Sequence, residues 1–490
     1  MSASRGAGRP PPLDRLILKG PLGRLILRPW FDRLALWLIV RWYLPLSRGW
    51  AGTRAIAASG GGAFEDGAPL PFRRRAGWAV RLVERRGRAY ELAAEAWEKA
   101  FFGARPPAEV ELRAAEIARE RAASRFMAAR IAFASLRHRL PPVKWAIAGP
   151  GEVARAHGAR LHDERAAWAL PTILPPVGLS HGVRGCYGVE RWLRFVSPKL
   201  GDTVWARVYE PEHPGAKPPT VIFLHGIAME TEMWRARADP VNALTRRGIR
   251  VVRPEGPWHG RRCPAGWYGG EWLVARGPLG LIDLFDAWVA ELALIVAWAR
   301  ETALGPVAVG GVSLGALASQ LAATAARHWP EECRPDALLL VATSGAVLEI
   351  TYDGALARAL GLAPELERAG WSREALERWR PLLEPQGAPA VAAEKIVMLL
   401  GRCDEVTPYS GGQALARRWA LPPSNVFVRE RGHFSVSLGL LDDPAPLDRL
   451  AGILLAGEGR WVVEQAEGDR EVTPLPYKNV RWRQRPSSGE

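Results

Sequence analysis

Two serines of the chain stand in the pattern G-x-S-x-G, in which a serine hydroxyl can act as a nucleophile. Ser180 lies in PPVGLSHGVRG, and Ser313 lies in VAVGGVSLGAL. The pattern exposes the hydroxyl only when a buried strand enters the first glycine and a helix leaves the second, because the tight turn then lifts the serine above the sheet edge. The N-terminus of that helix also faces the negative charge that develops during attack.

Only Ser313 has this context. The apolar stretch GPVAVG precedes it, and the helix-forming stretch GALASQLAATAAR follows it. Ser180 is preceded by TILPPV, whose prolines do not fit a central strand, and is followed by GVRGCYG, which does not form a helix. We therefore interpret Ser313 as the candidate nucleophile and Ser180 as a chance match in a chain with 50 glycines.

A serine hydroxyl is a weak nucleophile, so it needs a general base that a third group orients. His433 in VRERGHFSVSLG follows a predicted strand downstream of the serine and is the candidate base. Asp404 in LLGRCDEVTP follows the preceding predicted strand and is the candidate acid. The alternatives for the acid are the adjoining Glu405, or a residue after the strand before, near Glu349 or Asp353.

Acyl transfer also needs two backbone N–H groups that stabilise the oxyanion of the tetrahedral intermediate. Leu314 follows the candidate nucleophile directly and supplies one of them. Ile227 in FLHGIAMETEMW supplies the other, because Gly226 lets the chain turn sharply off the preceding strand. We interpret His225 in the same stretch as a structural loop histidine rather than a second base.

The elements that position these residues alternate between strand and helix. From residue 188 onward, short apolar stretches such as PTVIFLHG, GPVAVGG and DALLLVATS are separated by longer helical stretches. This alternation predicts an α/β domain with a mostly parallel central sheet. Residues 346–392 are helical and interrupt the alternation, which indicates an inserted cap over an enclosed apolar pocket.

Residues 188–455 resemble the α/β-hydrolase superfamily through FLHG, GVSLG, GRCDEVTP and RGHF, which occur in the family's order. The resemblance implies an α/β-hydrolase fold over residues 188–456, followed by a C-terminal tail at 457–490. It implies that Ser313, Asp404 and His433 are nucleophile, acid and base. It also implies acyl transfer without a cofactor or metal, usually as hydrolysis of a carboxylic ester.

A finer resemblance concerns the segment PEGPWHGRRCP, which is similar to E-x-P-x-x-G-x-R-x-P in the eighteenth group of eukaryotic α/β-hydrolase-domain proteins. The matching positions are Glu255, Pro257, Gly260, Arg262 and Pro264. This resemblance implies that His259 and either Arg261 or Arg262 lie at the pocket mouth. An arginine there could hold a phosphate or carboxylate of the substrate. The alternative is an arginine whose salt bridge braces the loop.

The net charge of +15 belongs to the first 150 residues, which hold 27 Lys and Arg against 12 Asp and Glu. Residues 1–70 form a basic arm in which Arg alternates with Leu and Trp, a composition typical of the membrane–water interface. The alternative is an arm packed on its own protein. Within this region, the Gly- and Ala-rich residues 51–69 are expected to be a linker. A helical region and an irregular linker follow at 71–187.

The basic arm predicts a surface that binds a membrane, in addition to the candidate active site. We expect contact between residues 1–50 and an anionic membrane, in a cytoplasmic protein that is peripheral at the inner membrane face. The best candidate for a spanning segment in this arm has an uncharged run of only seven residues, 34–40, which is far shorter than the roughly 20 apolar residues of a spanning helix. No nucleic-acid partner is expected, because no reading motif or stacking platform accompanies the arginines.

The leading hypothesis is a serine hydrolase for a carboxylic ester, with a lipid or another hydrophobic acyl ester as substrate. An acyltransferase with the same three residues is the first alternative, because an alcohol or thiol can replace water as the acceptor. A non-catalytic adaptor at a membrane surface is the second alternative. The intact serine, acid and histidine argue against the adaptor.

Overall fold

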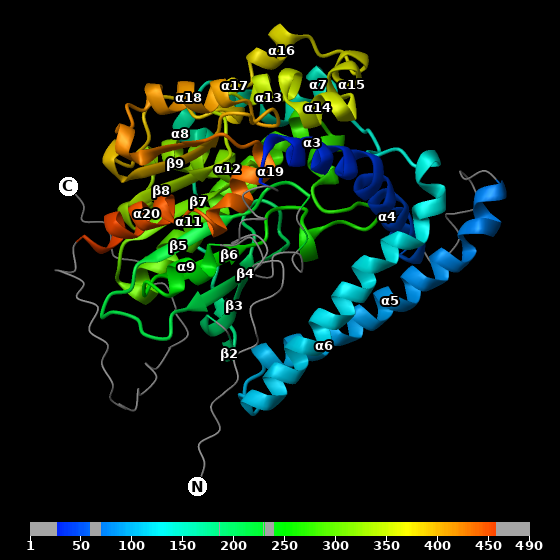
Figure 1. Cartoon of the computed structure of the whole chain (residues 1–490), viewed down its shortest axis with the longest axis horizontal. Helices are drawn as coiled ribbons and strands as arrows, with labels where there is room; N and C mark the ends of the chain where they lie inside the picture. The colour runs from blue at the N-terminus through cyan, green and yellow to red at the C-terminus, as the bar shows by residue number, and fades with distance from the viewer. Residues whose placement is uncertain (1–26, 59–69, 186, 229, 231–239, 457–490) are drawn as a thin grey trace.

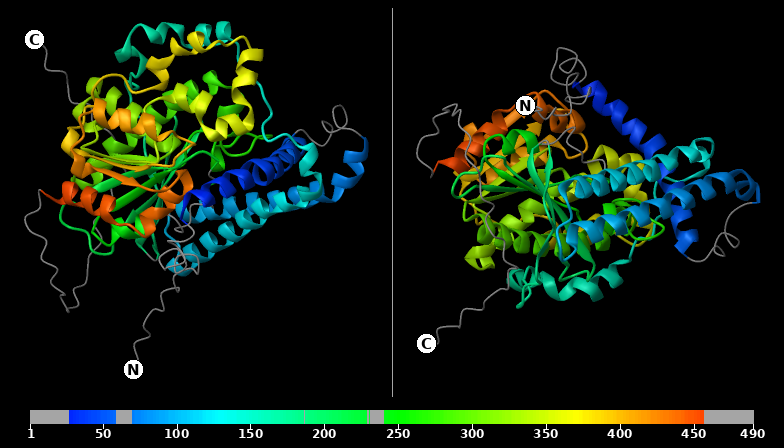
Figure 2. Two further views of the ribbon diagram at one scale, coloured as in Figure 1. Left: turned by 45° about the horizontal axis from the view of Figure 1, so that its top comes forward. Right: turned by 90° about the horizontal axis from the view of Figure 1, so that it is seen from below.

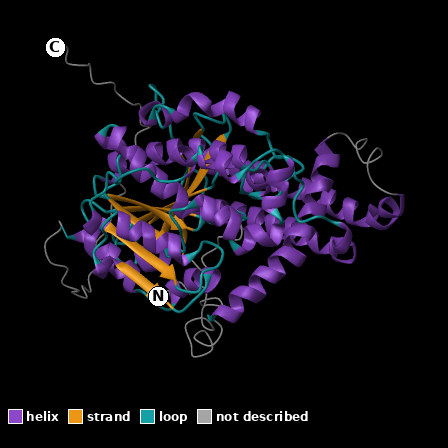
Figure 3. Cartoon of the chain, turned by 90° about the horizontal axis from the view of Figure 1, so that it is seen from above, coloured by secondary structure: helices purple, strands orange, loops and turns teal. Residues whose placement is uncertain are grey.

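A mixed β-sheet between layers of helices forms the centre of the molecule, and a long helical hairpin extends on one side of it (Figures 1 and 3). The computed structural model describes residues 27–58, 70–185, 187–228, 230 and 240–456.

The sheet has the strand order β1-β3-β4-β6-β5-β7-β8-β9-β10 in the described part of the chain, and β2 pairs with β3 off this path. Strands β6, β5, β7, β8, β9 and β10 run parallel, whereas β4 is antiparallel to both β6 and β3. The predicted mostly parallel sheet is therefore confirmed. The strands are β1 (Gly178–Leu179), β2 (Val183–Gly185), β3 (Gly188–Val196), β4 (Thr203–Glu210), β5 (Thr220–Leu224), β6 (Arg250–Pro254), β7 (Val307–Val312), β8 (Ala337–Val341), β9 (Ile396–Gly401) and β10 (Val426–Arg429).

Helices cover both faces of this sheet. The described α-helices outside both the cap and the N-terminal region are α7 (Pro150–His157), α8 (Glu164–Ala167), α9 (Val241–Thr245), α10 (Glu271–Ala275), α11 (Pro278–Ala303), α12 (Leu314–Ala325), α18 (Tyr409–Arg418), α19 (His433–Leu438) and α20 (Ala445–Leu455). Short 3₁₀ turns are η3 (Gly158–Leu161), η5 (Gly260–Arg262), η6 (Ala326–His328), η7 (Glu331–Cys333), η8 (Ala393–Lys395), η9 (Pro423–Asn425) and η10 (Gly439–Leu441).

Strand β5 shows how the core is divided between the two faces. All five of its residues are buried. Ile222 and Leu224 belong to the apolar cluster that includes α11 and α12, whereas Val221 and Phe223 belong to the cluster that includes α9 and α20. Side chains of a strand alternate between its faces, so a strand with apolar residues at every position is buried on both sides.

The cap lies over the carboxyl end of the sheet, at the top of Figure 1. Within the segment 346–392, which the sequence predicts to be a helical insertion, the chain forms five short helices between β8 and β9. These helices are α13 (Val347–Asp353), α14 (Ala355–Leu360), α15 (Leu362–Arg368), α16 (Arg373–Glu377) and α17 (Arg380–Leu383).

The N-terminal region is helical and lies against the α/β domain (Figure 2). Its elements are α3 (Pro29–Leu38), the π-helix η1 (Ile39–Tyr43), α4 (Leu44–Ala58), α5 (Leu70–Phe102), α6 (Glu109–Ala128) and the 3₁₀ helix η2 (Ala129–Arg139). Helix α4 continues through residues 51–58, which corrects the expectation that a linker begins at 51. The other part of that linker, 59–69, and residues 1–26 lie outside the described residues. Among the described helices, none has the length and apolar character needed to cross a membrane.

The α5–α6 hairpin packs on strands β3 and β4 through a cluster of tryptophans. Trp97 of α5 is buried, and its ring contacts Trp192 of β3 at a centroid distance of 5.4 Å and Trp205 of β4 at 5.8 Å. The guanidinium of Arg261 lies 4.5 Å from the Trp97 ring centroid. The hairpin therefore covers the outer strands of the sheet through a shared aromatic core.

The tryptophan cluster generates a stability prediction. Trp97→Ala removes a buried ring from this interface, so we expect the free energy of unfolding to fall by about 3–5 kcal/mol in urea titrations. Trp78→Ala is the matched control, because Trp78 lies on the same helix with 53% of its surface exposed. The control is expected to change stability by less than about 0.5 kcal/mol. Equal effects of the two substitutions would contradict this packing.

Candidate active site

Ser313 occupies a tight turn between β7 and α12. Its backbone φ of 56° and ψ of −118° lie outside the regions that ordinary residues prefer. Glycines permit this turn, because α12 passes very close to strand β5. A Cβ atom on Gly311 would lie 2.8 Å from the carbonyl oxygen of Leu224, and one on Gly315 would lie 2.6 Å from that of His225. Any larger side chain at either position would push the strand and the helix apart.

The structure links the side chains of the three residues predicted to be nucleophile, base and acid by hydrogen bonds. His433 Nε2 lies 3.0 Å from Ser313 Oγ, and His433 Nδ1 lies 2.8 Å from Asp404 Oδ2. The side chains of His433 and Asp404 are only 7% and 2% exposed. His433 can therefore accept the serine proton at Nε2 while its Nδ1–H donates to a buried carboxylate, which is the geometry of a general base.

The carboxylate that bonds His433 is that of Asp404 and not that of one of the alternatives. The backbone N–H groups of Val406 and Thr407 both donate to Asp404 Oδ1 at 2.9 Å, which fixes the carboxylate while its other oxygen receives the histidine. Glu405 is exposed beside it. The carboxylate of Glu349 is engaged by the hydroxyl of Ser410, and Asp353 is exposed on the cap.

Ser180, the other serine of the pattern, has a structural role. It lies directly after the two-residue edge strand β1 and is buried. Its hydroxyl donates to the carbonyl of His181 at 2.7 Å and accepts from the N–H of Trp192 at 2.8 Å. The hydroxyl therefore bonds the backbone both as donor and as acceptor, and it links the end of β1 to β3.

Ile227 and Leu314, the predicted oxyanion residues, both line a cavity beside Ser313. Leu314 is the first residue of α12, where backbone N–H groups have no intrahelical partner. The turn after β5 touches the serine, since a Cβ atom at Gly226 would lie 3.5 Å from Ser313 Cβ. The stabilisation of an oxyanion by these two N–H groups stays a prediction.

Arg262 is buried and paired inside the protein, which contradicts the prediction that it binds substrate at the pocket mouth. The side chain is 1% exposed, and its guanidinium bonds both oxygens of Glu291 at 2.7 Å and both oxygens of Asp202 at 2.9 Å. The carboxylates raise the pKa of Arg262 against the effect of burial. Two bidentate pairs occupy the donors that a substrate anion would need, so the alternative of an arginine that braces the loop describes this residue.

His259, the second predicted substrate residue, is buried and is not among the residues that line the two cavities bordering Ser313. Its ring packs against His225 at a centroid distance of 4.6 Å, and its Nδ1 lies 2.9 Å from the carbonyl oxygen of Pro257. Burial lowers the pKa of His259 to about 4, so the ring is neutral. His225 is equally buried, and its Nε2 accepts the N–H of Gly256 at 2.8 Å, which makes it structural too.

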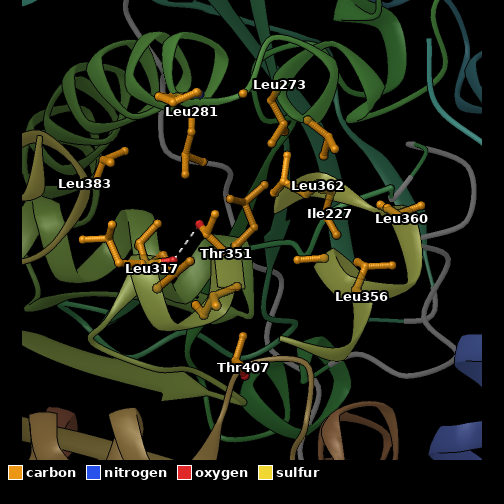
Figure 4. A pocket seen from close by; sticks show the side chains of 18 of the residues that line it. Ile227, Leu273, Leu281, Leu317, Thr351, Leu356, Leu360, Leu362, Leu383 and Thr407 are labelled. Carbon is orange, nitrogen blue, oxygen red and sulfur yellow. Dashed lines mark hydrogen bonds between the residues drawn. The ribbon is translucent and has the colours of Figure 1, made fainter. Parts of the chain in front are cut away.

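An apolar cavity of about 160 Å³ begins at Ser313 and continues between α11, α12 and the cap (Figure 4). In Figure 4 the labelled leucines of these elements point into it, and Thr407 marks the end near the candidate acid. Its apolar walls include Leu273, Leu281, Leu317, Leu348, Leu376 and Leu383. The cap and two core helices thus create a space beside the serine that suits a hydrocarbon group.

A second cavity of about 380 Å³ also borders Ser313 and is walled by the N-terminal region. Phe31 and Ala35 of α3 and Ile39 of η1 line it together with His433. These residues recur every four positions and therefore share one face of a helix. The four-residue spacing is visible in the sequence FDRLALWLI. The contribution to the cavity could not be predicted from it, because the opposite face of the same helix is apolar as well.

Asp32 of α3 holds the first turn of α19, the helix that begins with His433. Its Oδ1 accepts the N–H groups of Phe434 at 2.6 Å and Ser435 at 3.0 Å, and the Ser435 hydroxyl donates to Oδ2. An aspartate that accepts the free N–H groups at a helix start acts as an N-cap. Here the cap comes from a residue 402 positions away from Phe434.

A buried ion pair joins the N-terminal helices to the turn after β5. Arg130 of η2 donates to Glu230 at 2.7 Å, and both side chains are less than a tenth exposed. Arg130 also donates to the hydroxyl of Tyr43, which in turn donates to the carbonyl of Ala228 at 3.4 Å. These contacts of the N-terminal helices hold the turn that carries Ile227 in place.

A comparison with known families identifies the class to which this fold and site belong. The model of the Alpha/beta hydrolase family matches residues 221–476, just over half of the chain. The chain therefore belongs to the alpha/beta hydrolase family, and the expectation of a hydrolase enzyme is confirmed.

The solved structures similar to the chain include three hydrolases. A cold-adapted esterase from an Arctic intertidal metagenomic library is 18% identical over 54% of this chain and 94% of its own, with a TM-score of 0.36. The S-formylglutathione hydrolase from Agrobacterium tumefaciens is 17% identical over 56% and 98%, with a TM-score of 0.37. An acetyl xylan esterase from Paenibacillus sp. R4 is 15% identical over 56% and 88%, with a TM-score of 0.40.

A search among curated protein sequences finds no match. None of the structures named above belongs by its name to the eighteenth group of eukaryotic α/β-hydrolase-domain proteins, so that finer resemblance stays a prediction.

The contact between α3 and α19 predicts that Asp32 is a positioning residue. Asp32→Ala should lower the free energy of unfolding by about 1 kcal/mol and slow the reaction of Ser313 with a fluorophosphonate probe about tenfold, because His433 loses its fixed position. Asp32→Asn keeps an oxygen acceptor and should restore most of the rate.

Asp163→Ala is the control for Asp32→Ala, since Asp163 caps α8 through the N–H of Ala166 at 3.0 Å, away from the site. The control should lose stability and keep the wild-type labelling rate. If both alanine variants label at the wild-type rate, Asp32 has only a structural role.

Proposed function

We propose that this hydrolase cleaves a hydrophobic carboxylic ester through an acyl-enzyme on Ser313. The observation that carries the proposal is the chain of hydrogen bonds from Ser313 Oγ through both nitrogens of His433 to Asp404, at a turn between a buried strand and a helix N-terminus. A serine in this environment has a base to accept its proton and donors nearby for the charge that develops.

The reaction follows from the geometry in two halves. Ser313 Oγ attacks the ester carbonyl while its proton moves to His433 Nε2, and the N–H groups of Ile227 and Leu314 stabilise the oxyanion. Collapse of the tetrahedral intermediate breaks the bond to the alcohol, which leaves with the proton from His433. Water then repeats the sequence on the acyl-enzyme, releases the acid and regenerates Ser313.

The two cavities at Ser313 suggest how an ester is placed. The cavity of about 160 Å³ is apolar and takes the acyl chain, and the cavity of about 380 Å³ takes the alcohol side. An apolar cavity of roughly 150 Å³ accommodates benzene, so the smaller one has room for about six carbons. This division supports a hydrophobic acyl ester, such as a lipid, as the substrate class.

Covalent labelling tests the nucleophile. Full-length wild type should react with a fluorophosphonate probe, and Ser313→Ala should reduce the rate by about 10⁶-fold, because the attacking oxygen is gone. Ser180→Ala is the matched control and should label as wild type does while it remains folded in a thermal scan. Labelling that survives Ser313→Ala, or a folded wild type that does not label, would contradict the acyl-enzyme.

Acyl-chain preference tests the smaller cavity. The value of kcat/KM for p-nitrophenyl hexanoate should exceed that for the acetate by more than tenfold, because each buried methylene contributes about 0.8 kcal/mol. Leu281→Trp fills part of the cavity and should remove that advantage. Ile173→Trp, at a site that is 77% exposed, should preserve it. An unchanged preference in Leu281→Trp would place the acyl chain elsewhere.

A further inference from the structure

Helix α3 presents a second face, opposite the one that lines the larger cavity. The side chains of Leu34, Trp37 and Leu38 are 45%, 52% and 44% exposed, and Trp30 on the same face is 52% exposed. Their spacing of three, four and seven residues places them on one side of the helix. Single exposed apolar residues are ordinary, but a contiguous set with two tryptophans marks an interaction surface.

The charges on this face all have one sign. Arg33 and Arg41 are exposed and fall within the same arc of the helix. Asp32, which is the one acidic residue among residues 27–43, is turned inward to α19. The exposed face therefore combines tryptophan, leucine and arginine without a carboxylate. Arginine stems and tryptophan rings in this combination suit the boundary between lipid headgroups and acyl chains.

We propose that this face, formed by Arg33, Leu34, Trp37, Leu38 and Arg41 with Trp30 beside them, docks on an anionic lipid bilayer. We name it the α3 outer face. A second copy of the chain fits it less well, because an isologous contact would set the same arginines against each other. An anionic bilayer pairs with those arginines and also receives the apolar side chains.

Docking would bring the larger cavity beside Ser313 close to the lipid surface, and the consequence for the substrate rests on the proposed function. Phe31, Ala35 and Ile39 on the inner side of α3 and η1 line the cavity that borders Ser313. Only the width of one helix then separates the α3 outer face from that cavity. An ester dissolved in the bilayer reaches the serine with little passage through water, so the substrate class narrows to esters that partition into lipid.

Vesicle flotation with the full-length Ser313→Ala protein tests the surface without any contribution from catalysis. The protein should bind vesicles of phosphatidylcholine with phosphatidylglycerol and bind pure phosphatidylcholine much more weakly, and added salt should reduce the difference. Leu34→Ser combined with Trp37→Ser should weaken binding at least tenfold. Arg33→Gln and Arg41→Gln should each weaken it roughly fivefold, and only with anionic vesicles.

Ile173→Ser provides the control, since it removes an exposed apolar side chain from another surface. It should bind as the parent protein does, and thermal scans should show that every variant is folded. Equal binding by the Leu34/Trp37 variant and its parent would overturn the proposal. So would a dimer of the parent in analytical ultracentrifugation that the same variant converts to a monomer, because the face would then join two copies.

The vesicle result and the labelling result are independent. Vesicle binding in a protein whose Ser313 does not label would remove the catalytic proposal and leave the α3 outer face as a docking surface. Labelling without vesicle binding would keep the hydrolase and overturn the docking.

Discussion

The close approach of α12 to strand β5 is the constraint on which the candidate site depends. It requires glycine at positions 311 and 315, and it drives Ser313 into a backbone conformation that lifts the hydroxyl off the sheet. The same approach brings the turn after β5 beside the serine, so that Ile227 and Leu314 border one cavity. The histidine and aspartate reach this point because β9 and β10 run parallel to β7 and end at the same edge.

Much of this could be predicted from the sequence, because the information is local. A buried strand before Ser313 and a helix after it distinguish it from Ser180, which has the same pair of glycines, and the order of strand ends selects His433 and Asp404. The mostly parallel sheet follows in the same way from the alternation of strands and helices. In each case the signal lies in the stretch of chain around the residue, even where its partners in space come from distant segments.

The errors concern residues whose partners are distant in the chain. Arg262 is basic and lies in a loop near the site, but Glu291 on α11 and Asp202 after β3 bury its charge. Asp32 gave no signal, since one aspartate in an arginine-rich segment looks like any surface residue. The wall of the larger cavity was missed for a related reason, because α3 is apolar on both sides and the pattern does not say which side is buried.

The N-terminal helices are part of the hydrolase rather than an appendage to it. A tryptophan cluster fixes the α5–α6 hairpin to the outer strands, and buried pairs of Arg130 with Glu230 and of Arg48 with Glu271 fix the region to the turn after β5 and to the start of α10. Breaking buried pairs of this kind is costly, because each leaves an uncompensated charge. The region is therefore joined to the domain it covers by buried contacts at several places.

The cap that Asp32 provides for α19 has a consequence for the order of folding. The contact closes a loop of some 400 residues, from the beginning of the described chain to nearly its end. Contacts between such distant residues form late, since a long stretch of chain must be ordered first. The histidine helix therefore gains its last support only when the chain between Asp32 and Phe434, which are 402 positions apart, has been synthesised and folded. Local opening of α3 alone would loosen His433 while the sheet stays intact, so catalytic competence is less durable than the fold itself.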